Sequence, residues 1–437
     1  MESEDIQNLG EGRLKELGAN KKALLVGVFF TTRERAMCAE HLNELKSLCD
    51  TYGLSVIEKM AVLLKAISAS TFLGKGKTEE IVELIQTLKI DIVIFDDEIG
   101  PQQQRNLEAI FKRPVIDRTE LILGVFNKHA KTNEARIQVD LAHYRYQLPR
   151  LRRLWTHLHR QRGGGGGGRG GGYLKGEGER QIEIDRRLLR RRITRLQENL
   201  VVIRKNRIIQ RRARKKSGIP TFAIVGYTNA GKSTLLNTLT EAKVLVEDKL
   251  FATLDTTTRK FTLPNHQDIL LTDTVGFIRK IPHTLVAAFK GTLEEAIQAD
   301  ILLHIIDTSG TQVDEQIEST NHVLKELRVN KKPVIHVFNK MDRYNGRVAK
   351  FRLKYPNACF ISATEKTGVD ALMEKMINAV SSLRSVVSLK VPQSHYAFVS
   401  QIMREGKVLS CEYLENDVLL QVEIPTHLEE KTAPYIH

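Results

Sequence analysis

Residues 221–233 read Thr-Phe-Ala-Ile-Val-Gly-Tyr-Thr-Asn-Ala-Gly-Lys-Ser, and this stretch decides the fold of the second half of the chain. A β-forming apolar run leads into the spacing GxxxxGK[ST], and a leucine-rich helical segment follows. This order predicts a parallel α/β domain whose first turn wraps phosphates (a P-loop). The residues predicted to contact the nucleotide here are Gly226, Tyr227, Thr228, Asn229, Ala230, Gly231, Lys232 and Ser233.

Two of these side chains have predicted chemical roles. Lys232 is expected to reach the β- and γ-phosphate oxygens, which makes it a catalytic candidate. The hydroxyl of Ser233 is a predicted Mg²⁺ ligand, so we expect a magnesium-dependent nucleotide site.

Four residues after the apolar run 334–338 predict which nucleotide base is bound: Asn339, Lys340, Met341 and Asp342. A carboxylate at Asp342 can accept from both the ring N–H and the exocyclic amine of guanine. Adenine offers neither donor on that edge, and the unpaired carboxylate would cost about 1–3 kcal/mol. Guanine is therefore the predicted base, with a backbone contact from Ser362, Ala363 and Thr364.

Two further segments are predicted to meet the phosphates. Asp273, Thr274, Val275 and Gly276 end an expected strand, which places Asp273 beside the metal and makes the Gly276 amide a catalytic candidate near the γ-phosphate. Upstream, threonine hydroxyls are available as the last protein ligand of the metal, and spacing does not choose between Thr253, Thr256, Thr257 and Thr258. The expected GTP contacts in this upstream segment are Phe251, Ala252, Thr253, Leu254 and Asp255.

Phe277 follows Gly276, where a Ras-type enzyme carries a glutamine that orients the attacking water. We therefore expect slow intrinsic GTP hydrolysis. Acceleration would come from an activating partner, or from a K⁺ ion recruited through Asn229.

The expected fold class is α/β, in four parts. Alternating β-type and helical runs predict an N-terminal α/β domain at 1–130. The second alternation predicts a nucleotide-binding domain (G domain) with a mainly parallel sheet at 218–384, whose expected strands include 301–307 and 334–339. A small α+β domain is expected at 385–437, with a helix near 395–405 and strands near 407–413 and 418–424. Between the first two domains, residues 131–217 carry apolar seams with 4-3-4-3 spacing on both sides of a glycine run, which predicts a long antiparallel helical hairpin with a flexible basic tip at 161–180.

Charge is concentrated in one segment of the chain. The formal net charge is +15, and residues 186–216 hold fourteen basic residues and one acid. Such a cluster favours a polyanionic partner, because bound cations release condensed counterions from nucleic acid. The alternatives are a solvated helix face and, for the glycine run, a plain linker. The predicted RNA contacts are Arg160, Arg162, Arg169, Arg186, Arg187, Arg190 and Arg191.

The remaining bulk features predict a cytoplasmic protein. The apolar runs are far shorter than the roughly 20 residues of a membrane span, and the acidic residues 1–5 do not resemble a signal peptide. The four cysteines are widely spaced and suggest neither a disulfide framework nor a zinc site. We expect a monomer with no DNA partner and no integral membrane association.

From about residue 17 to about residue 385 the order of parts resembles the HflX family of ribosome-associated GTPases. The residues that carry the resemblance are 133–151 with Glu134 and Leu148-Pro-Arg150, Trp155-Thr-His157-Leu, the glycine run, 183–192, Phe251-Ala-Thr-Leu-Asp255, Asp273-Thr-Val-Gly-Phe-Ile-Arg279 and Leu285-Val-Ala-Ala-Phe289. The sequence departs from the family at 176–179, where Gly-Glu-Gly-Glu replaces Gly-Pro-Gly-Glu, and at Thr256, where the family usually has proline.

The resemblance implies a GTPase that binds the large ribosomal subunit and its rRNA and dissociates or rescues stalled ribosomes under stress. It also nominates Thr253 as the switch threonine on Mg²⁺, which adds Thr253 to the catalytic candidates. Members of the family have been linked to ATP binding by the first domain. The alternatives are an RNA-binding GTPase in ribosome assembly or RNA modification, and a binding protein that holds nucleotide only as a structural ligand.

Overall fold

The structure is a computed structural model that describes residues 20–153, 173–216, 218–240, 250–251, 256–280, 295–310, 312–329, 332–344, 346, 348–382, 384–425 and 428–436. The chain divides into two compact units. Unit 1 comprises Met1–Arg204, Glu247–Asp255 and Lys280–Thr292, and unit 2 comprises Lys205–Val246, Thr256–Arg279 and Leu293–His437.

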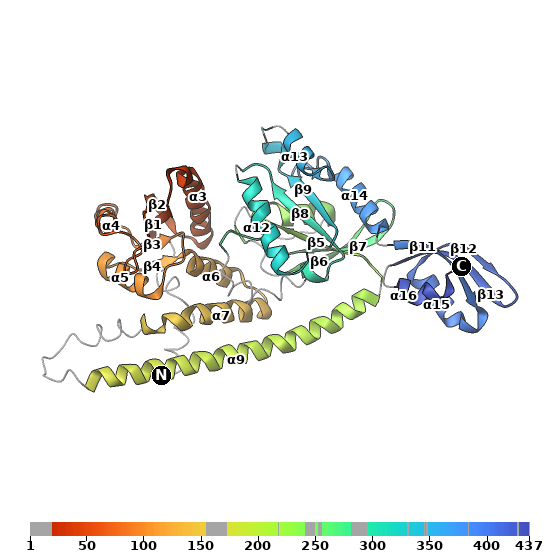
Figure 1. The fold of residues 1–437 in the computed structure, drawn as a ribbon, viewed down its shortest axis with the longest axis horizontal. Helices are drawn as coiled ribbons and strands as arrows, with labels where there is room; N and C mark the ends of the chain where they lie inside the picture. The colour runs from red at the N-terminus through yellow and green to blue at the C-terminus, as the bar shows by residue number, and fades with distance from the viewer. Residues whose placement is uncertain are drawn as a thin grey trace. The chain divides into compact units, whose positions relative to one another are not determined.

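Unit 1 is built on a four-stranded parallel sheet with the strand order β2-β1-β3-β4. Its strands are β1 (Lys22–Phe29), β2 (Ser55–Leu63), β3 (Ile92–Phe95) and β4 (Val115–Asp117). Its helices are α3 (Arg35–Tyr52), α4 (Lys75–Leu88), α5 (Pro101–Phe111), α6 (Arg118–His129) and α7 (Asn133–Gln147), with short 3-10 turns η1 (Thr32–Glu34) and η2 (Leu148–Arg153). Helices cover both faces of the sheet, so β3 is buried along its whole length (Figure 1).

A buried polar network ties the end of this sheet to the helices that follow it. The Asp117 carboxylate, fully buried, accepts from the Glu120 amide at 2.9 Å and thereby caps α6. It also accepts from the Tyr146 hydroxyl at 3.0 Å and from the Arg150 guanidinium at 3.3 Å. Burial raises the pKa of Asp117 to about 7, against the opposing effect of Arg150.

The predicted hairpin corresponds to α7 and the long helix α9 (Tyr173–Lys216), which lie side by side in Figure 1. Leu141 and Leu151 from the first seam and Leu189 and Leu200 from the second are buried. An Arg192 guanidinium nitrogen donates to the Tyr144 hydroxyl at 3.2 Å. The predicted tip residues Arg160, Arg162 and Arg169 lie outside the described residues.

Unit 2 contains a six-stranded sheet with the order β10-β9-β8-β5-β7-β6, in which all neighbours are parallel except β6 and β7. The strands are β5 (Thr221–Gly226), β6 (Thr257–Thr262), β7 (Asp268–Asp273), β8 (Ile301–Asp307), β9 (Val334–Asn339) and β10 (Cys359–Phe360). The helices are α10 (Lys232–Thr240), α12 (Val313–Glu326), α13 (Ala349–Lys354) and α14 (Val369–Ser381), with the 3-10 turn η3 (Met341–Arg343).

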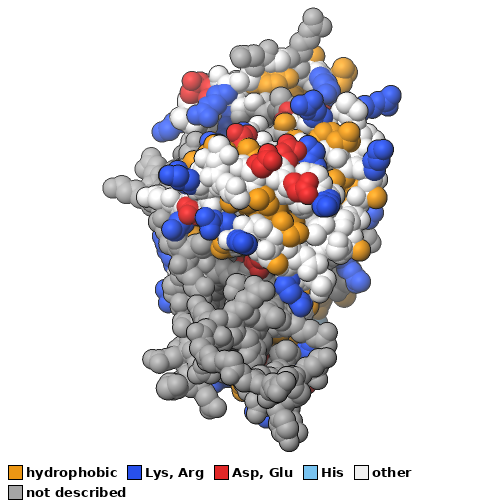
Figure 2. All heavy atoms as spheres, turned by 90° about the vertical axis from the view of Figure 1, so that its left-hand side faces the viewer, with side chains coloured by type: hydrophobic (Ala, Val, Ile, Leu, Met, Phe, Trp, Pro, Cys, Tyr) orange, Lys and Arg blue, Asp and Glu red, His pale blue; other side chains and the backbone are white. Residues whose placement is uncertain are grey.

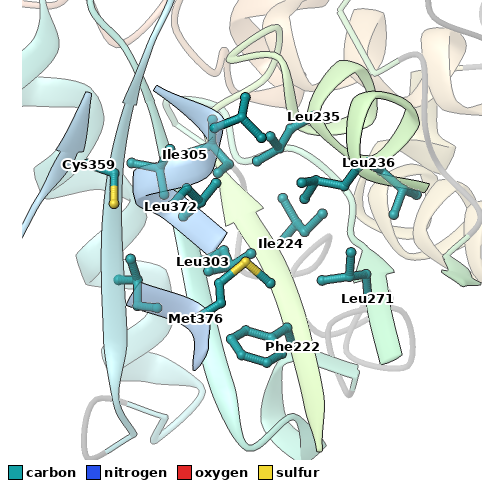
Figure 3. Packing of buried hydrophobic residues seen from close by; sticks show 14 of the residues in the cluster. Phe222, Ile224, Leu235, Leu236, Leu271, Leu303, Ile305, Cys359, Leu372 and Met376 are labelled. Atoms are coloured by element: carbon teal, nitrogen blue, oxygen red, sulfur yellow. The ribbon is translucent and has the colours of Figure 1, made fainter. Parts of the chain in front are cut away.

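One face of this sheet packs against α10 and α14 (Figure 3). Phe222, Leu303 and Ile305 project from the central strands toward Leu236 and Met376 on the helices, and all are fully buried. Because β5 and β8 lie in the middle of the sheet and are buried on both faces, they read as continuous apolar runs and fix the loops at their carboxyl ends.

The chain ends in a three-stranded antiparallel sheet with the order β11-β13-β12. It comprises β11 (Arg384–Pro392), β12 (Lys407–Tyr413) and β13 (Asp417–Pro425), with α15 (Tyr396–Glu405), α16 (Glu429–Thr432) and the 3-10 turns η4 (Gln393–His395) and η6 (Ala433–Tyr435). Sequence analysis missed β11, although its inward residues Val387, Leu389 and Val391 alternate with period two. The α/β fold class is confirmed.

Two surface properties bear on partners. No helix among the described residues is long and apolar enough to cross a membrane. Figure 2 shows basic, acidic and apolar side chains interspersed over the described part of the face that it draws.

Candidate functional site: a nucleotide-binding P-loop

The loop between β5 and α10 has a backbone that only glycine allows at its two ends. Gly226 has φ +150° and Gly231 has φ +91°. A Cβ atom on Gly226 would collide with the carbonyl oxygen of Ile305, and one on Gly231 would collide with the side-chain nitrogen of Asn339. The loop is therefore pressed against β8 on one side and against the end of β9 on the other.

Lys232 and Gly276 lie together at the start of α10. The Lys232 ammonium is buried and donates to the carbonyl oxygen of Tyr227 at 2.8 Å. Burial lowers the pKa of Lys232 to about 8, against the opposing effect of Asp273. A Cβ atom on Gly276 would lie 2.9 Å from the Lys232 ammonium nitrogen and 2.8 Å from Thr228 Cα, so this approach also requires glycine.

Ser233 and Asp273 supply the oxygen atoms expected of a magnesium site. The Ser233 Oγ donates to Asp273 Oδ2 at 2.6 Å, and Asp273 is fully buried as the last residue of β7. Hydroxyl and carboxylate oxygens are the hard donors that Mg²⁺ prefers, so these residues fit the ion. Thr253, the third predicted participant, lies outside the described residues, as do Ala252, Leu254 and Asp255.

The predicted base-reading residues meet the P-loop through Asn339. Its side-chain nitrogen donates to the Ala230 carbonyl at 2.9 Å, and its side-chain oxygen accepts from the Ala363 amide at 3.0 Å. Thr238 of α10 donates to the Ala363 carbonyl at 2.8 Å. Asn339, which is buried, thus joins the phosphate loop to residues 362–364, which sequence analysis had grouped only by motif.

Three hydrogen bonds that hold the P-loop were missed by sequence analysis. Phe277 donates its amide to the Gly226 carbonyl at 3.0 Å and accepts from the Thr228 amide at 2.7 Å. The Tyr227 hydroxyl accepts from the Arg279 amide at 2.8 Å. The Phe277 ring is buried in the cluster that contains Val225 and Ala296, so it serves the core and cannot orient a water molecule. Backbone contacts of this kind leave no sequence signal.

Three family profiles match consecutive parts of the chain. They are described as "GTP-binding GTPase N-terminal" over residues 39–127, "GTP-binding GTPase Middle Region" over residues 129–214 and "50S ribosome-binding GTPase" over residues 221–340. The chain is 47% identical to the GTPase HflX of Chlamydia pneumoniae, over 95% of this chain and 88% of that protein. It is 40% identical to the GTPase HflX of Escherichia coli K12, over 93% and 94%.

The chain belongs to the GTPase HflX family. It is accordingly an enzyme that binds and hydrolyses GTP, and the resemblance found from the sequence is confirmed. Among solved structures, a GTP-binding protein of Sulfolobus solfataricus in complex with GDP aligns with a TM-score of 0.43 and 25% identity, covering 83% of this chain and 99% of that one.

The predicted RNA-binding arginines that the structure describes, and the predicted GTP contact Phe251, lie on other elements of this HflX-family chain. Arg187, Arg190 and Arg191 are exposed on α9, and Arg186 pairs with Glu183 at 3.4 Å. Phe251 belongs to unit 1, where its ring packs edge-on against Phe126 with centroids 4.5 Å apart. A direct contact of Phe251 with nucleotide remains a prediction.

Proposed function

We propose that this GTPase binds the large ribosomal subunit through the basic helix α9 and the glycine-rich tip, and uses GTP to dissociate or rescue stalled ribosomes. The observation that carries the proposal is the pairing of a GTPase domain, of the type described as 50S ribosome-binding, with a helix of concentrated positive charge. Exposed arginines on α9 suit the phosphate backbone of rRNA.

In the proposed mechanism the P-loop amides and Lys232 hold the β- and γ-phosphates. A pKa of about 8 leaves Lys232 mostly protonated at pH 7, so it can offset the charge that builds up on these oxygens. Ser233, Asp273 and Thr253 would hold Mg²⁺, which neutralises phosphate charge when bound. The Gly276 amide would donate to the γ-phosphate.

Recognition of the base is assigned to the loop after β9. Asp342 would accept from guanine, and Asn339 would keep this loop in register with the P-loop through its contact to Ala230. Since position 277 offers no water-orienting side chain, hydrolysis would be slow until a partner or a K⁺ ion at Asn229 completes the site. Asn229 is exposed in the loop, which suits the second option.

The proposal is tested by measuring GTP turnover with and without large subunits, and by sucrose-gradient profiles of intact ribosomes with a non-hydrolysable GTP analogue. We expect stimulated turnover and loss of the intact-ribosome peak. Lys232→Ala serves as the inactive control. Turnover that large subunits leave unchanged would contradict the proposal. Stimulation without splitting would favour the second candidate, a GTPase in ribosome assembly or RNA modification.

The contribution of α9 is tested separately with Arg187→Ala, Arg190→Ala and Arg191→Ala combined. Each lost phosphate contact should flatten the dependence of log affinity on log salt by roughly 0.7 to 0.9. A matched control removes Lys390, Arg404 and Lys407 from the C-terminal sheet domain. Equal slopes for the two triple variants would mean that α9 is not the RNA-binding element.

A further inference from the structure

The predicted guanine-binding loop runs from Asn339 to Asp342 and is called the guanine loop below. The backbone of its second residue, Lys340, is strained. Its φ of +62° lies in the left-handed region, which a side chain with a Cβ atom rarely adopts. Such a conformation persists only where surrounding contacts impose it. The residues that impose it come from the carboxyl end of the neighbouring strand β8.

Asp307, the last residue of β8, holds the Lys340 side chain. Its Oδ2 lies 2.8 Å from the Lys340 ammonium nitrogen, and both side chains are 17% exposed. Its other oxygen, Oδ1, accepts from the Ser309 amide at 2.9 Å and from the Ser309 hydroxyl at 2.6 Å. With Oδ1 fixed by Ser309, the carboxylate can present only Oδ2 to the lysine.

Thr308, the next residue, holds the backbone of the same loop. It is buried, and both its hydroxyl and its amide donate to the carbonyl oxygen of Asn339, at 2.7 and 3.1 Å. The Asn339 side chain contacts Ala230 and Ala363, and Thr308 contacts its backbone carbonyl. Asp307 and Thr308 thus contact Lys340 and Asn339, two consecutive residues of the guanine loop.

We propose that Asp307 and Thr308 are positioning residues for guanine recognition, which set the loop from Asn339 to Asp342 in its binding geometry through the Lys340 ammonium and the Asn339 carbonyl. The inference rests on the assignment of that loop to the base. Among the described residues, Asp307 and Thr308 contact Ser309, Asn339, Lys340 and Met341, and none of these is proposed to hold the phosphates or Mg²⁺. Their loss should therefore weaken binding of the base and spare the chemical step.

The decisive variant is Asp307→Asn, which keeps an oxygen for Ser309 and removes the charge opposite Lys340. We expect the KM for GTP and the dissociation rate of a fluorescent GDP to rise about tenfold, with kcat within twofold of the unmodified enzyme. The preference for GTP over ATP should fall by a similar factor. Thr308→Val, which removes the hydroxyl but keeps the shape, should shift the same quantities in the same direction.

Two controls separate positioning from general damage. Asp314→Asn removes an aspartate of the same unit that pairs with Lys350 and Lys354 on the surface, and it should leave the KM unchanged. Lys340→Met should reproduce the loss, and the double variant Lys340→Met with Asp307→Asn should lose no more than either alone. Additive losses, or equal falls in kcat and kcat/KM, would overturn the proposal.

The assignment of the loop is checked independently by Asp342→Asn, which should weaken GTP and improve binding of xanthosine triphosphate because an amide can donate to the xanthine carbonyl. If Asp342→Asn has no effect, the loop itself is misassigned. If Asp342→Asn behaves as expected and Asp307→Asn does not, the guanine loop stands and the positioning role of β8 fails.

Discussion

The Ser233 hydroxyl donates to the Asp273 carboxylate across 2.6 Å and so joins the first turn of α10 to the last residue of β7. These residues are 40 positions apart, and both come to the same point because β5 and β7 are parallel neighbours. The carboxyl ends of adjacent parallel strands are where such folds place their ligands. The contact gathers the two described oxygen donors proposed for Mg²⁺.

Replacing Ser233 by alanine should remove one proposed metal ligand and the hydrogen-bond donor to Asp273. We expect the Mg²⁺-dependent part of GTP affinity to fall by roughly tenfold or more, since about 1.4 kcal/mol corresponds to a factor of ten. Affinity measured with excess chelator should change little. The control is Thr240→Ala on the same helix, whose hydroxyl donates to the Leu236 carbonyl. A loss that persists without Mg²⁺ would argue against a ligand role.

Replacing Gly276 by alanine, which adds a methyl group, should slow GTP hydrolysis strongly and lower the stability of the fold less. A Cβ atom there would meet Thr228 and the Lys232 ammonium nitrogen, so the proposed γ-phosphate amide or the lysine must shift. A displacement of about 1 Å can cost on the order of a hundredfold in rate. Gly310→Ala is the matched control, because among the described residues other than its chain neighbours no atom lies within 4 Å of an added Cβ. Equal kcat values for the two variants would exclude the crowding argument.

Replacing Phe277 by glutamine should not accelerate GTP hydrolysis. The Phe277 side chain is 2% exposed and packs in the core, so a glutamine there would bury an amide instead of meeting the attacking water. We expect unchanged or slower single-turnover hydrolysis and a loss of stability of about 3–5 kcal/mol, comparable to Phe→Ala. Phe277→Leu controls for lost volume. Accelerated hydrolysis in the glutamine variant would show that this segment rearranges when nucleotide binds.

The central strands of the G-domain sheet could be predicted almost to the residue, because a strand buried on both faces reads as one apolar run. The predicted segments at 301–307 and 334–339 coincide with β8 and β9. The motifs also predicted which loops face each other. The contacts that shape those loops could not be predicted, since Asn339 reaches Ala230 across 109 residues and Asp307 meets Lys340 only because β8 and β9 are adjacent.

Short or half-exposed elements were harder to predict. The three-residue strand β4 carries too few positions for a periodic pattern, and its Asp117 reads as an ordinary loop acid. Only the fold shows that this aspartate is buried, caps α6 and contacts Tyr146 at the end of α7 and Arg150 in the following turn η2. The role of Asp117 therefore depends on tertiary packing, which a single sequence does not encode locally.

Titration of Asp117 should make stability fall as pH rises. Its pKa is about 7 in the folded state, above the usual value of 3.8. Between these two pH values the folded state therefore keeps a proton that the unfolded state has lost. The stabilisation is complete below about pH 4 and disappears as pH rises through about 7, with a slope of at most about 1.4 kcal/mol per pH unit. Urea unfolding followed by circular dichroism at pH 5 and pH 8 measures this difference.

Asp117→Asn isolates that contribution, because an amide does not titrate. Other carboxylates also titrate over this range, so the expected result is that stability declines less between pH 5 and pH 8 in the variant than in the unmodified protein. Asp314→Asn is the control, because the Lys354 ammonium lowers the pKa of Asp314 instead of raising it. Replacing Asp314 should therefore leave the decline in stability between pH 5 and pH 8 in place. If the Asp117 variant declined as steeply as the unmodified protein, Asp117 would have to be ionised in the fold, held so by Arg150.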